Sequence, residues 1–493
     1  MMSDKNRERF GSRLGFILVS AGCAIGIGSV WKFPYLCGQF GGASFMLIFL
    51  FFLLILGIPV LVCELAMGRA AQKSAAKAFD VLEKPQTSWH YLKWISLIGC
   101  YLLMMFYTTV TGWILAYCWK HLTGSFVGAT PEEVGVVWGE TLAQTGPMIF
   151  WTVLVCIIGT IVVFIGMENG LEKVNKFMMV SLLLLTFILA IRSVTLDGAG
   201  AGLKFYLVPD FQAMQEIGIG NILFAAMSQA FFTLSLGIGA MLIFGSYIDK
   251  QRSLAGEAVT ITILSTFAGI MSGFIVIPAC FAFGLQPDSG PNLIFVTIPN
   301  LFTQMAGGQF WGALFFLFLS FASMTTVTAV MENIAAFTSE QFGWERRKSI
   351  VINGILIAIL SLPCVFGYNI WSDFQPLGAG TAVLDLEDFI VSNNLLPLGS
   401  FAFVLFCTRR YGWGWANFID EANAGNGLKF PYKIGGYMSY VVPAIILFLY
   451  LKGYYDKFAP MGTAVLTGWM IFAVALIGFI VFCAVHKKKP SGK

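Results

Sequence analysis

The sequence predicts an all-α integral membrane protein with about twelve transmembrane helices, arranged as a five-plus-five inverted repeat in which helices 1 and 6 are broken. Hydrophobic residues make up 57% of the 493 residues and charged residues only 11%, whereas soluble domains carry about 25% charged residues. Apolar runs of about 20 residues recur along the chain, and a helix of that length crosses a hydrocarbon core of roughly 30 Å. The tripeptide Gly-Ile-Gly interrupts two of these runs. The low share of charged residues and the long apolar runs predict the helix bundle, and the Gly-Ile-Gly tripeptides predict the breaks.

Composition also argues against several classes of function. The formal net charge is +4, and the basic residues lie at the ends of apolar runs instead of forming a patch, so no nucleic-acid partner is expected. The ten cysteines lie within or beside apolar runs without a CxxC or Cys/His cluster, which predicts buried, inert thiols. The short charged N-terminal arm has no A-x-A cleavage site, so we expect the first helix to be retained. We expect a protein of the lipid bilayer that is not an enzyme.

Hydropathy and charge give the order of the spans and their orientation. The spans cover roughly 13–34, 44–67, 94–119, 147–166, 174–192, 220–247, 257–284, 309–337, 350–367, 384–408, 436–452 and 462–485. Basic residues concentrate in the even-numbered loops and at both termini, which predicts that both termini are cytoplasmic and that the protein lies in the cell membrane. The segment from Pro291 to Met305 is too short to cross, and is either a re-entrant segment over an outer vestibule or a loop packed on the rim.

The expected organisation follows from these spans. It consists of a cytoplasmic N-terminal arm (1–12), a first repeat (13–192), an extracellular loop (193–219), a second repeat (220–408), a cytoplasmic loop (409–435), two further spans (436–485) and a cytoplasmic C-terminal tail (486–493).

Gly-Ile-Gly occurs at Gly26–Gly28 in the first span and at Gly237–Gly239 in the sixth. Each glycine costs about 1 kcal/mol against alanine within a helix, and close helix packing is the simpler explanation for either pair alone. The two spans open the two five-helix halves, and interrupted helices at corresponding positions indicate an inverted-repeat transporter. A break frees carbonyl oxygens for a cation, and the half-helix N-terminus attracts an anion such as a carboxylate.

The eighth span contains Ala322 and the pair Thr325–Thr326. Ala322 and Thr325 lie three residues apart on one helix face and can offer further neutral oxygens to a cation. Taken alone, the threonines favour local hydrogen bonds to their own helix turn.

Several long motifs in order carry a resemblance. They are Arg13-Leu14-Gly15 with Trp31-Lys32-Phe33-Pro34, Gly57-Ile58-Pro59 with Glu64-Leu65-Ala66-Met67-Gly68-Arg69, Pro209-Asp210-Phe211, Phe231-Phe232-Thr233-Leu234-Ser235-Leu236-Gly237, Ala306-Gly307-Gly308, and Leu384-Asp385 with Asp388-Phe389. By these residues the sequence resembles the neurotransmitter:sodium symporter family, specifically its leucine-transporter-like bacterial amino-acid branch. The resemblance runs from Arg7 to about residue 410 and implies that fold, with sodium as the coupling ion.

The resemblance implies two sodium sites of unequal quality. The first has the carbonyls of Gly22, Ile25 and Ala322 and the hydroxyls of Thr325 and Thr326. In the second, Ser29 and Ser265 stand where the family usually has asparagines, leaving Ala24 and Thr233 as retained ligands. One sodium per cycle is therefore preferred, and two remain the alternative.

The resemblance also implies a substrate with its own carboxylate, because Gly26 stands where monoamine carriers place an aspartate. The carboxylate would meet the backbone from Ala24 to Gly28 and the hydroxyl of Tyr107, and the amine would meet carbonyls near Phe232, Thr233 and Ser235. The side-chain pocket would be formed by Leu103, Phe232, Ile238 and Val330, which are all apolar. A neutral, aliphatic or aromatic amino acid follows.

The implied gates are Phe232 and Tyr107 as an outer lid, Lys32 with Asp388 as an outer ion pair, and Arg7 with Glu340, supported by Tyr247, as an inner latch. The family's chloride ligands are a tyrosine on span 2 and a serine on span 7, where this chain has Phe49 and Gly269. No chloride requirement is expected. Glu64 lies within the membrane, where it either bonds the unwound backbone or has a plain structural role at a helix end.

The predicted function is sodium-coupled uptake of a neutral, hydrophobic amino acid by alternating access. An amino-acid-binding membrane sensor without transport is the alternative, favoured by the altered second sodium site.

Overall fold

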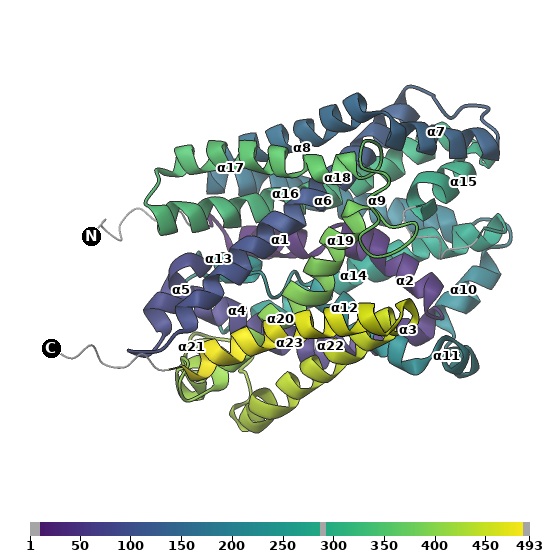
Figure 1. The fold of residues 1–493 in the computed structure, drawn as a ribbon. Helices are drawn as coiled ribbons and strands as arrows, with labels where there is room; N and C mark the ends of the chain where they lie inside the picture. Colours follow the sequence, from purple (N-terminus) through teal and green to yellow (C-terminus); the bar gives the residue numbers. More distant parts are fainter. Residues whose placement is uncertain (1–9, 286–291, 487–493) are drawn as a thin grey trace.

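The computed structural model describes residues 10–285 and 292–486, and these fold almost entirely into helices (Figure 1). Within these residues, ten helices are long and apolar enough to cross a membrane, and a bent pair raises the number to eleven. The expected sixth span divides into two helices that are each too short to cross alone, and this accounts for the difference from about twelve. The molecule is an all-helical membrane protein with a broken first helix.

The helices of the first half follow the apolar runs. They are α1 (Arg13–Ala24), α2 (Phe33–Gln39), α3 (Ala43–Phe52), α4 (Ile58–Ala71), α6 (Lys93–Leu122), α8 (Thr145–Ile165) and α9 (Lys173–Val194), with the connecting helices α5 (Ala75–Leu82), α7 (Pro131–Ala143), α10 (Ala199–Leu207) and α11 (Phe211–Ile217). Helices α3 and α4 form one span through a π-helical segment, and a second such segment extends α9 to Met167.

The second half begins with the divided span. Its helices are α12 (Ile219–Thr233), α13 (Ala240–Gly245), α14 (Leu254–Ala282), α15 (Ile298–Gln304), α16 (Gly308–Phe342), α17 (Arg346–Leu360), α18 (Leu362–Phe366), α19 (Val383–Ile390) and α20 (Leu396–Thr408), followed by α21 (Trp415–Ala422), α22 (Val442–Phe458) and α23 (Thr463–Val485). The stretch around α15 packs on α16 and α7, with Phe295 stacked on Trp138 at 4.5 Å between ring centroids.

Burial separates central helices from peripheral ones. In α16, 83% of the apolar window is buried, against 17% in α23. A helix that exposes apolar side chains on this scale requires an apolar solvent, so α23 lies where lipid would surround it. The core is built around α16, α6, α1 and α14.

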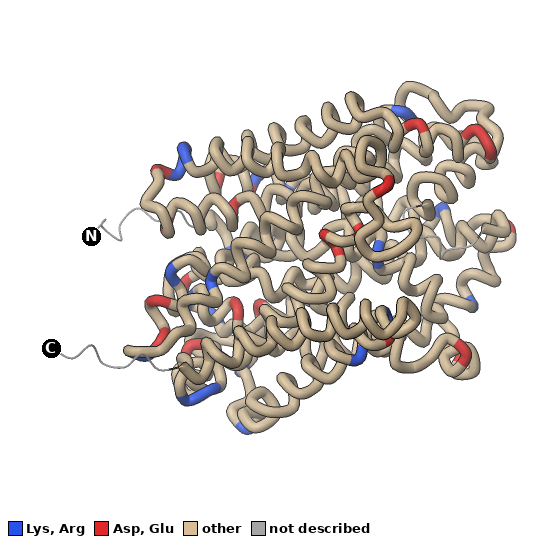
Figure 2. The backbone as a smooth tube through the Cα atoms, in the orientation of Figure 1, with Lys and Arg blue, Asp and Glu red and all other residues tan. Residues whose placement is uncertain are grey.

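Charged residues gather toward the two ends of the bundle, and few lie between them (Figure 2). The beginning of α1 and the end of α23 point toward the same end (Figure 1). All ten cysteines are buried and free. The few charged side chains buried inside the bundle, among them Glu64 and Glu332, therefore stand out.

Candidate substrate and ion site

The first helix breaks between Ala24 and Gly28, and its two parts meet at an angle of 55°. Ile25 caps α1 through its backbone N–H, which donates to Ala21 O at 2.7 Å. A Cβ atom on Gly26 would lie 2.1 Å from Tyr107 Oη and 2.3 Å from Thr326 Oγ1. Only glycine fits there, so the break leaves backbone groups directly opposite these two hydroxyls.

The second break covers 234–239, between α12 and α13. Ser235, Gly237 and Gly239 have φ values of 51°, 91° and 72°, a region that glycine adopts readily and other residues rarely. The buried Glu64 holds this loop, because its Oε1 accepts a hydrogen bond from Gly237 N at 2.6 Å. Ser235 Oγ donates to Cys23 O at 3.1 Å and so joins the two breaks.

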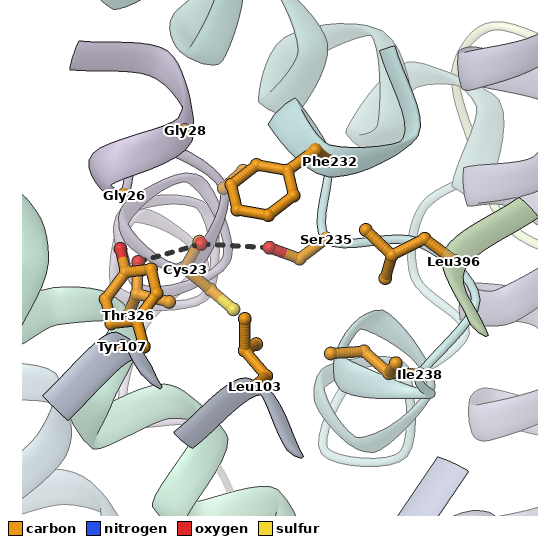
Figure 3. A pocket seen from close by; sticks show the side chains of 11 residues that line it. Cys23, Gly26, Gly28, Leu103, Tyr107, Phe232, Ser235, Ile238, Thr326 and Leu396 are labelled. Carbon is orange, nitrogen blue, oxygen red and sulfur yellow. Dashed lines mark hydrogen bonds between the residues drawn. The ribbon is translucent and has the colours of Figure 1, made fainter. Parts of the chain in front are cut away.

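A small cavity lies between the breaks (Figure 3). It is lined by Cys23, Ala24, Gly26, Gly28, Leu103, Tyr107, Phe232, Ser235, Ile238, Thr326 and Leu396. Eight of the ten predicted substrate residues are in this set, whereas Thr233 and Val330 are not. Its volume is about 20 Å³, room for about one water molecule, so side chains such as Phe232 and Leu396 have to move to admit an amino acid.

The polar groups of the cavity lie on one side. Tyr107 Oη accepts a hydrogen bond from Ile27 N at 2.7 Å, and Thr326 Oγ1 and Ser235 Oγ both donate to Cys23 O, at 3.1 Å each. The opposite side is formed by Leu103, Ile238 and Leu396 (Figure 3). No residue of this described lining set carries a charge, so the cavity suits a neutral side chain beside a polar backbone.

The oxygens expected for the first sodium site come together between α1 and α16. Thr325 Oγ1 lies 2.9 Å from Gly22 O and 2.8 Å from Ala322 O. Thr326 Oγ1 lies 3.5 Å from Gly22 O. Neutral oxygens at this spacing suit a hard cation. Ile25 directly follows α1, where its carbonyl has no further helical turn to bond.

The residues of the doubtful second sodium site bond mainly to their surroundings. Ser29 Oγ donates to Ala24 O at 3.2 Å, and Ser265 Oγ donates to Ile261 O of its own helix at 2.9 Å. Thr233 Oγ1 accepts from Gln229 Nε2 at 3.1 Å. The same nitrogen donates to Gly28 O at 2.7 Å. The Gln229 amide therefore bonds both Thr233 and the broken part of the first helix.

The residues predicted to form the outer gate meet beside the cavity. Lys32 Nζ lies 2.9 Å from Asp388 Oδ2 and 3.2 Å from Ser392 Oγ. It also lies 4.7 Å from the ring centroid of Phe232, within the range of a cation–π contact. The ion pair and the aromatic lid are therefore one assembly. A second cavity of about 230 Å³ lies beside it and is lined in part by Trp31, Lys32, Phe232 and Asp388.

The predicted inner latch is only partly described, because Arg7 lies outside the described residues. Glu340 Oε2 accepts hydrogen bonds from Ser74 N at 2.9 Å and Ser74 Oγ at 2.8 Å. Tyr247, expected to support Glu340, donates through Oη to Glu332 Oε1 at 2.7 Å. The start of α1 is also tied to α9, since Glu172 accepts from Gly11 N at 2.7 Å and Ser12 Oγ at 2.9 Å.

The sequence analysis did not identify Glu332, Gln229, Leu396 or Glu172 as residues of these assemblies. A signal existed for Glu332, because an acid inside an apolar span needs a partner, and the same rule had identified Glu64. No comparable signal existed for Leu396, whose place in the cavity depends on how α20 packs against the break in span six.

At the two positions of the family's chloride ligands, this chain has aromatic and backbone groups. Phe49 packs on Phe33 with ring centroids 4.9 Å apart. A Cβ atom on Gly269 would lie 3.7 Å from the Phe33 ring. The Phe33 ring is thus near both positions, and the Cβ position of Gly269 is also 3.6 Å from Ser29 O, which accepts a hydrogen bond from Ser272 Oγ at 2.9 Å.

Comparisons with known proteins agree in fold and in family. The model of the Sodium:neurotransmitter symporter family matches residues 7–133 and 132–488. The chain is 34% identical over 453 residues to the uncharacterized sodium-dependent transporter YhdH of Bacillus subtilis (strain 168), covering 92% of this chain and 98% of that protein. A sodium-dependent transporter of Haemophilus influenzae is 29% identical over 466 residues, covering 91% and 99%. The crystal structure of MhsT in complex with L-phenylalanine matches with a TM-score of 0.82 and 34% identity, covering 91% of this chain and all of that one (100%).

Proposed function

The chain belongs to the Sodium:neurotransmitter symporter family, a family of sodium-dependent membrane transporters, and from this premise we propose that it couples inward sodium movement to uptake of a neutral, hydrophobic amino acid. The observation that carries the substrate class is the cavity between the two breaks, with backbone and hydroxyl groups on one side and uncharged, apolar side chains on the other. Bacterial relatives and the basic loops support a place in the cell membrane with both termini in the cytoplasm.

The substrate contacts follow from this division of the cavity. The backbone between Ala24 and Gly28 and the Tyr107 hydroxyl would bind the carboxylate, as hydrogen-bond donors at the start of a half-helix do. Carbonyls of the second break would bind the amine. The apolar wall would leave a charged side chain without a partner, which costs several kcal/mol in a buried site. The L-phenylalanine bound to MhsT has the chemistry that this cavity would accept.

We propose one sodium per cycle, bound by Gly22, Ile25, Ala322, Thr325 and Thr326. The amide nitrogen of Gln229, which donates to Thr233 Oγ1 at 3.1 Å, supports this count, because the donor occupies an oxygen that Thr233 would otherwise offer to a second cation. One sodium gains about 2.3 kcal/mol per 100 mV and about 1.4 kcal/mol per tenfold gradient. Together these support roughly 500-fold accumulation of a zwitterion.

We also propose that transport needs no chloride. Phe33, Phe49 and Gly269 present no hydrogen-bond donor to an anion where the family's tyrosine and serine would stand. A buried anion without donors or a cation is strongly disfavoured.

The test is uptake of a panel of radiolabelled amino acids into proteoliposomes, with an inward sodium gradient set against an equal potassium gradient. Sodium-dependent accumulation of neutral amino acids, unchanged when gluconate replaces chloride, is the expected result. Saturable sodium-dependent binding without accumulation would instead indicate the sensor. At steady state, one sodium predicts a tenfold change in accumulation per tenfold change in gradient and two predict a hundredfold change.

A further inference from the structure

Glu387 on α19 is a buried acid without a counter-charge. It is 4% exposed, and within the described part of the chain no N–H or O–H group donates to either carboxyl oxygen, so the weakly polar Cys364 thiol is its side-chain contact. Its neighbours on the same helix are satisfied, because Asp388 pairs with Lys32 at 2.9 Å and Asp385 Oδ2 accepts from Ala382 N at 2.7 Å. Glu387 is thus set apart from the acids around it.

The titratable groups that face Glu387 are weakly polar or acidic. From α18 and the turn after it come the Cys364 thiol and the Tyr368 phenol, and the Cys364 thiol also faces Thr109 of α6. Asp385 is the nearby acid on its own helix. Lys457 of α22 lies near Asp385 and Asp388 instead. Among the described residues, we therefore find no cation facing Glu387.

An isolated buried carboxylate is costly, since removing it from water without a partner costs several kcal/mol after relaxation, and such a group neutralises instead. The neutral acid is therefore the form that fits this conformation. We propose that Glu387 is a proton-binding site, and that it takes up a proton when the outer gate closes.

The link to the gate is the helix that carries both residues. Leu384, Asp385 and Asp388 line the outer cavity of about 230 Å³, while Glu387 is turned away toward α18. A movement of α19 that separates Asp388 from Lys32 also moves Glu387 relative to Cys364 and lets water reach it. A glutamate in water ionises with a pKa of about 4.3, so the opened site releases its proton at neutral pH.

The direction of the coupling follows from this difference. At pH values between those at which Glu387 ionises in the open gate and in the closed gate, the closed gate binds one more proton. Acid outside therefore favours the closed gate, and alkali favours the open gate. One linked proton changes the equilibrium by up to roughly tenfold per pH unit. The inference concerns the gate of the proposed transporter, but its tests need no transported substrate.

The first test is infrared difference spectroscopy of the full chain in lipid at pH 7.5. We expect a protonated-carboxyl band that is lost in Glu387→Gln and kept in Glu216→Gln, a matched change at an exposed acid of α11. Lys32→Gln, which weakens the closed gate, should reduce the same band. A band left unchanged by Glu387→Gln would overturn the proton site, and a band unchanged by Lys32→Gln would overturn the coupling.

The second test measures gate opening with one introduced thiol. All native cysteines are buried, so Val110→Cys, which lines the outer cavity, would report access to a membrane-impermeant reagent. After division by the thiol's own ionisation, labelling should rise by at most roughly tenfold per pH unit between pH 6 and 8.5, and the corrected rate should be flat in the Glu387→Gln background. A pH response retained after that change, beyond the thiol's own ionisation measured on a small thiol, would contradict the proposal. Both tests measure the gate and not transport, so their outcomes would stand even if the protein took up no amino acid.

Discussion

Arg346 and Glu332 form a two-bond ion pair at one end of α16, with Nη1–Oε1 and Nη2–Oε2 distances of 2.9 and 2.8 Å. The Glu332 side chain is fully buried, whereas that of Arg346 is 29% exposed. Tyr247 adds a third hydrogen bond to the same carboxylate. The ion pair connects α16 to α17, and the Tyr247 hydrogen bond connects both to the segment after α13. Tyr247 is one of the residues predicted to form the inner latch.

Because the two side chains are buried to different extents, substituting one or the other should lower the free energy of unfolding by different amounts. Arg346→Gln leaves a fully buried carboxylate with Tyr247 as its described donor, and should lower the free energy of unfolding by about 3 kcal/mol. Glu332→Gln leaves a cation that can reach water, so its cost should be smaller. Thermal unfolding in detergent with a fluorescent thiol reporter measures both. The double variant should be more stable than Arg346→Gln alone, and a double variant that is simply additive would show that the two charges are not coupled.

The proposed first sodium site predicts that one substitution in it lowers the affinity for sodium. Thr325→Val keeps the shape of the side chain but removes an oxygen that lies within 2.9 Å of Gly22 O. We expect the sodium concentration for half-maximal uptake to rise about tenfold, the equivalent of about 1.4 kcal/mol. Ser320→Ala is the matched control, because its hydroxyl bonds only Phe316 O on the same helix among the described residues. An equal effect in both variants would assign the loss to α16 packing.

The second break predicts that Gly237 is indispensable for stability. A Cβ atom there would lie 2.2 Å from Leu396 O, and φ is +91°. Gly237→Ala should lower the melting temperature and abolish sodium-dependent binding. Gly468→Ala in α23 is the control, since nothing lies within 4 Å of its Cβ position and alanine is favoured over glycine in a helix by roughly 0.5–1 kcal/mol. Its melting temperature should stay equal or rise.

The outer pair predicts a modest kinetic effect. Both members are partly exposed, at 26% and 30% of the side chain, and such pairs contribute about 0–1 kcal/mol. Asp388→Asn should therefore speed dissociation of the neutral amino acid identified in the uptake panel up to roughly fivefold. The control is Asp456→Asn on α22, which breaks the ion pair of Asp456 with Lys452, whose side chains are 23% and 40% exposed. It should leave the dissociation rate unchanged. If both substitutions sped dissociation equally, Asp388 would have no specific role in the gate.

The positions of the spans and of the two breaks were predictable because both signals are local. An apolar run must be about 20 residues long to cross lipid, and a glycine pair inside it weakens the helix where it stands. The sixth span shows the limit of this reasoning. Hydropathy gives 220–247 as one run and the glycine pair predicts a break within it, but neither predicts the form of that break, which is α12, an irregular loop with Ser235 at positive φ, and α13.

The family pattern also placed most of the cavity lining and the outer pair, because those residues lie inside its motifs. It did not reveal that Gln229 bonds Thr233, or that Tyr247 bonds Glu332. Each of these contacts depends on a side-chain rotamer or on the rotation of one helix against another, and neither is fixed by the spacing of residues in one segment.

The sequence by itself therefore determined the helical membrane architecture, the two breaks and the chemistry available at them. Only the tertiary structure decided which groups meet: Leu396 of α20 against Gly237, Arg346 against Glu332, and Glu387 against the Cys364 thiol without a cation among the described residues. The physical reason is that crossing lipid imposes a requirement on each segment alone, through its length and apolarity, whereas pairing a buried polar group depends on which helices pack together.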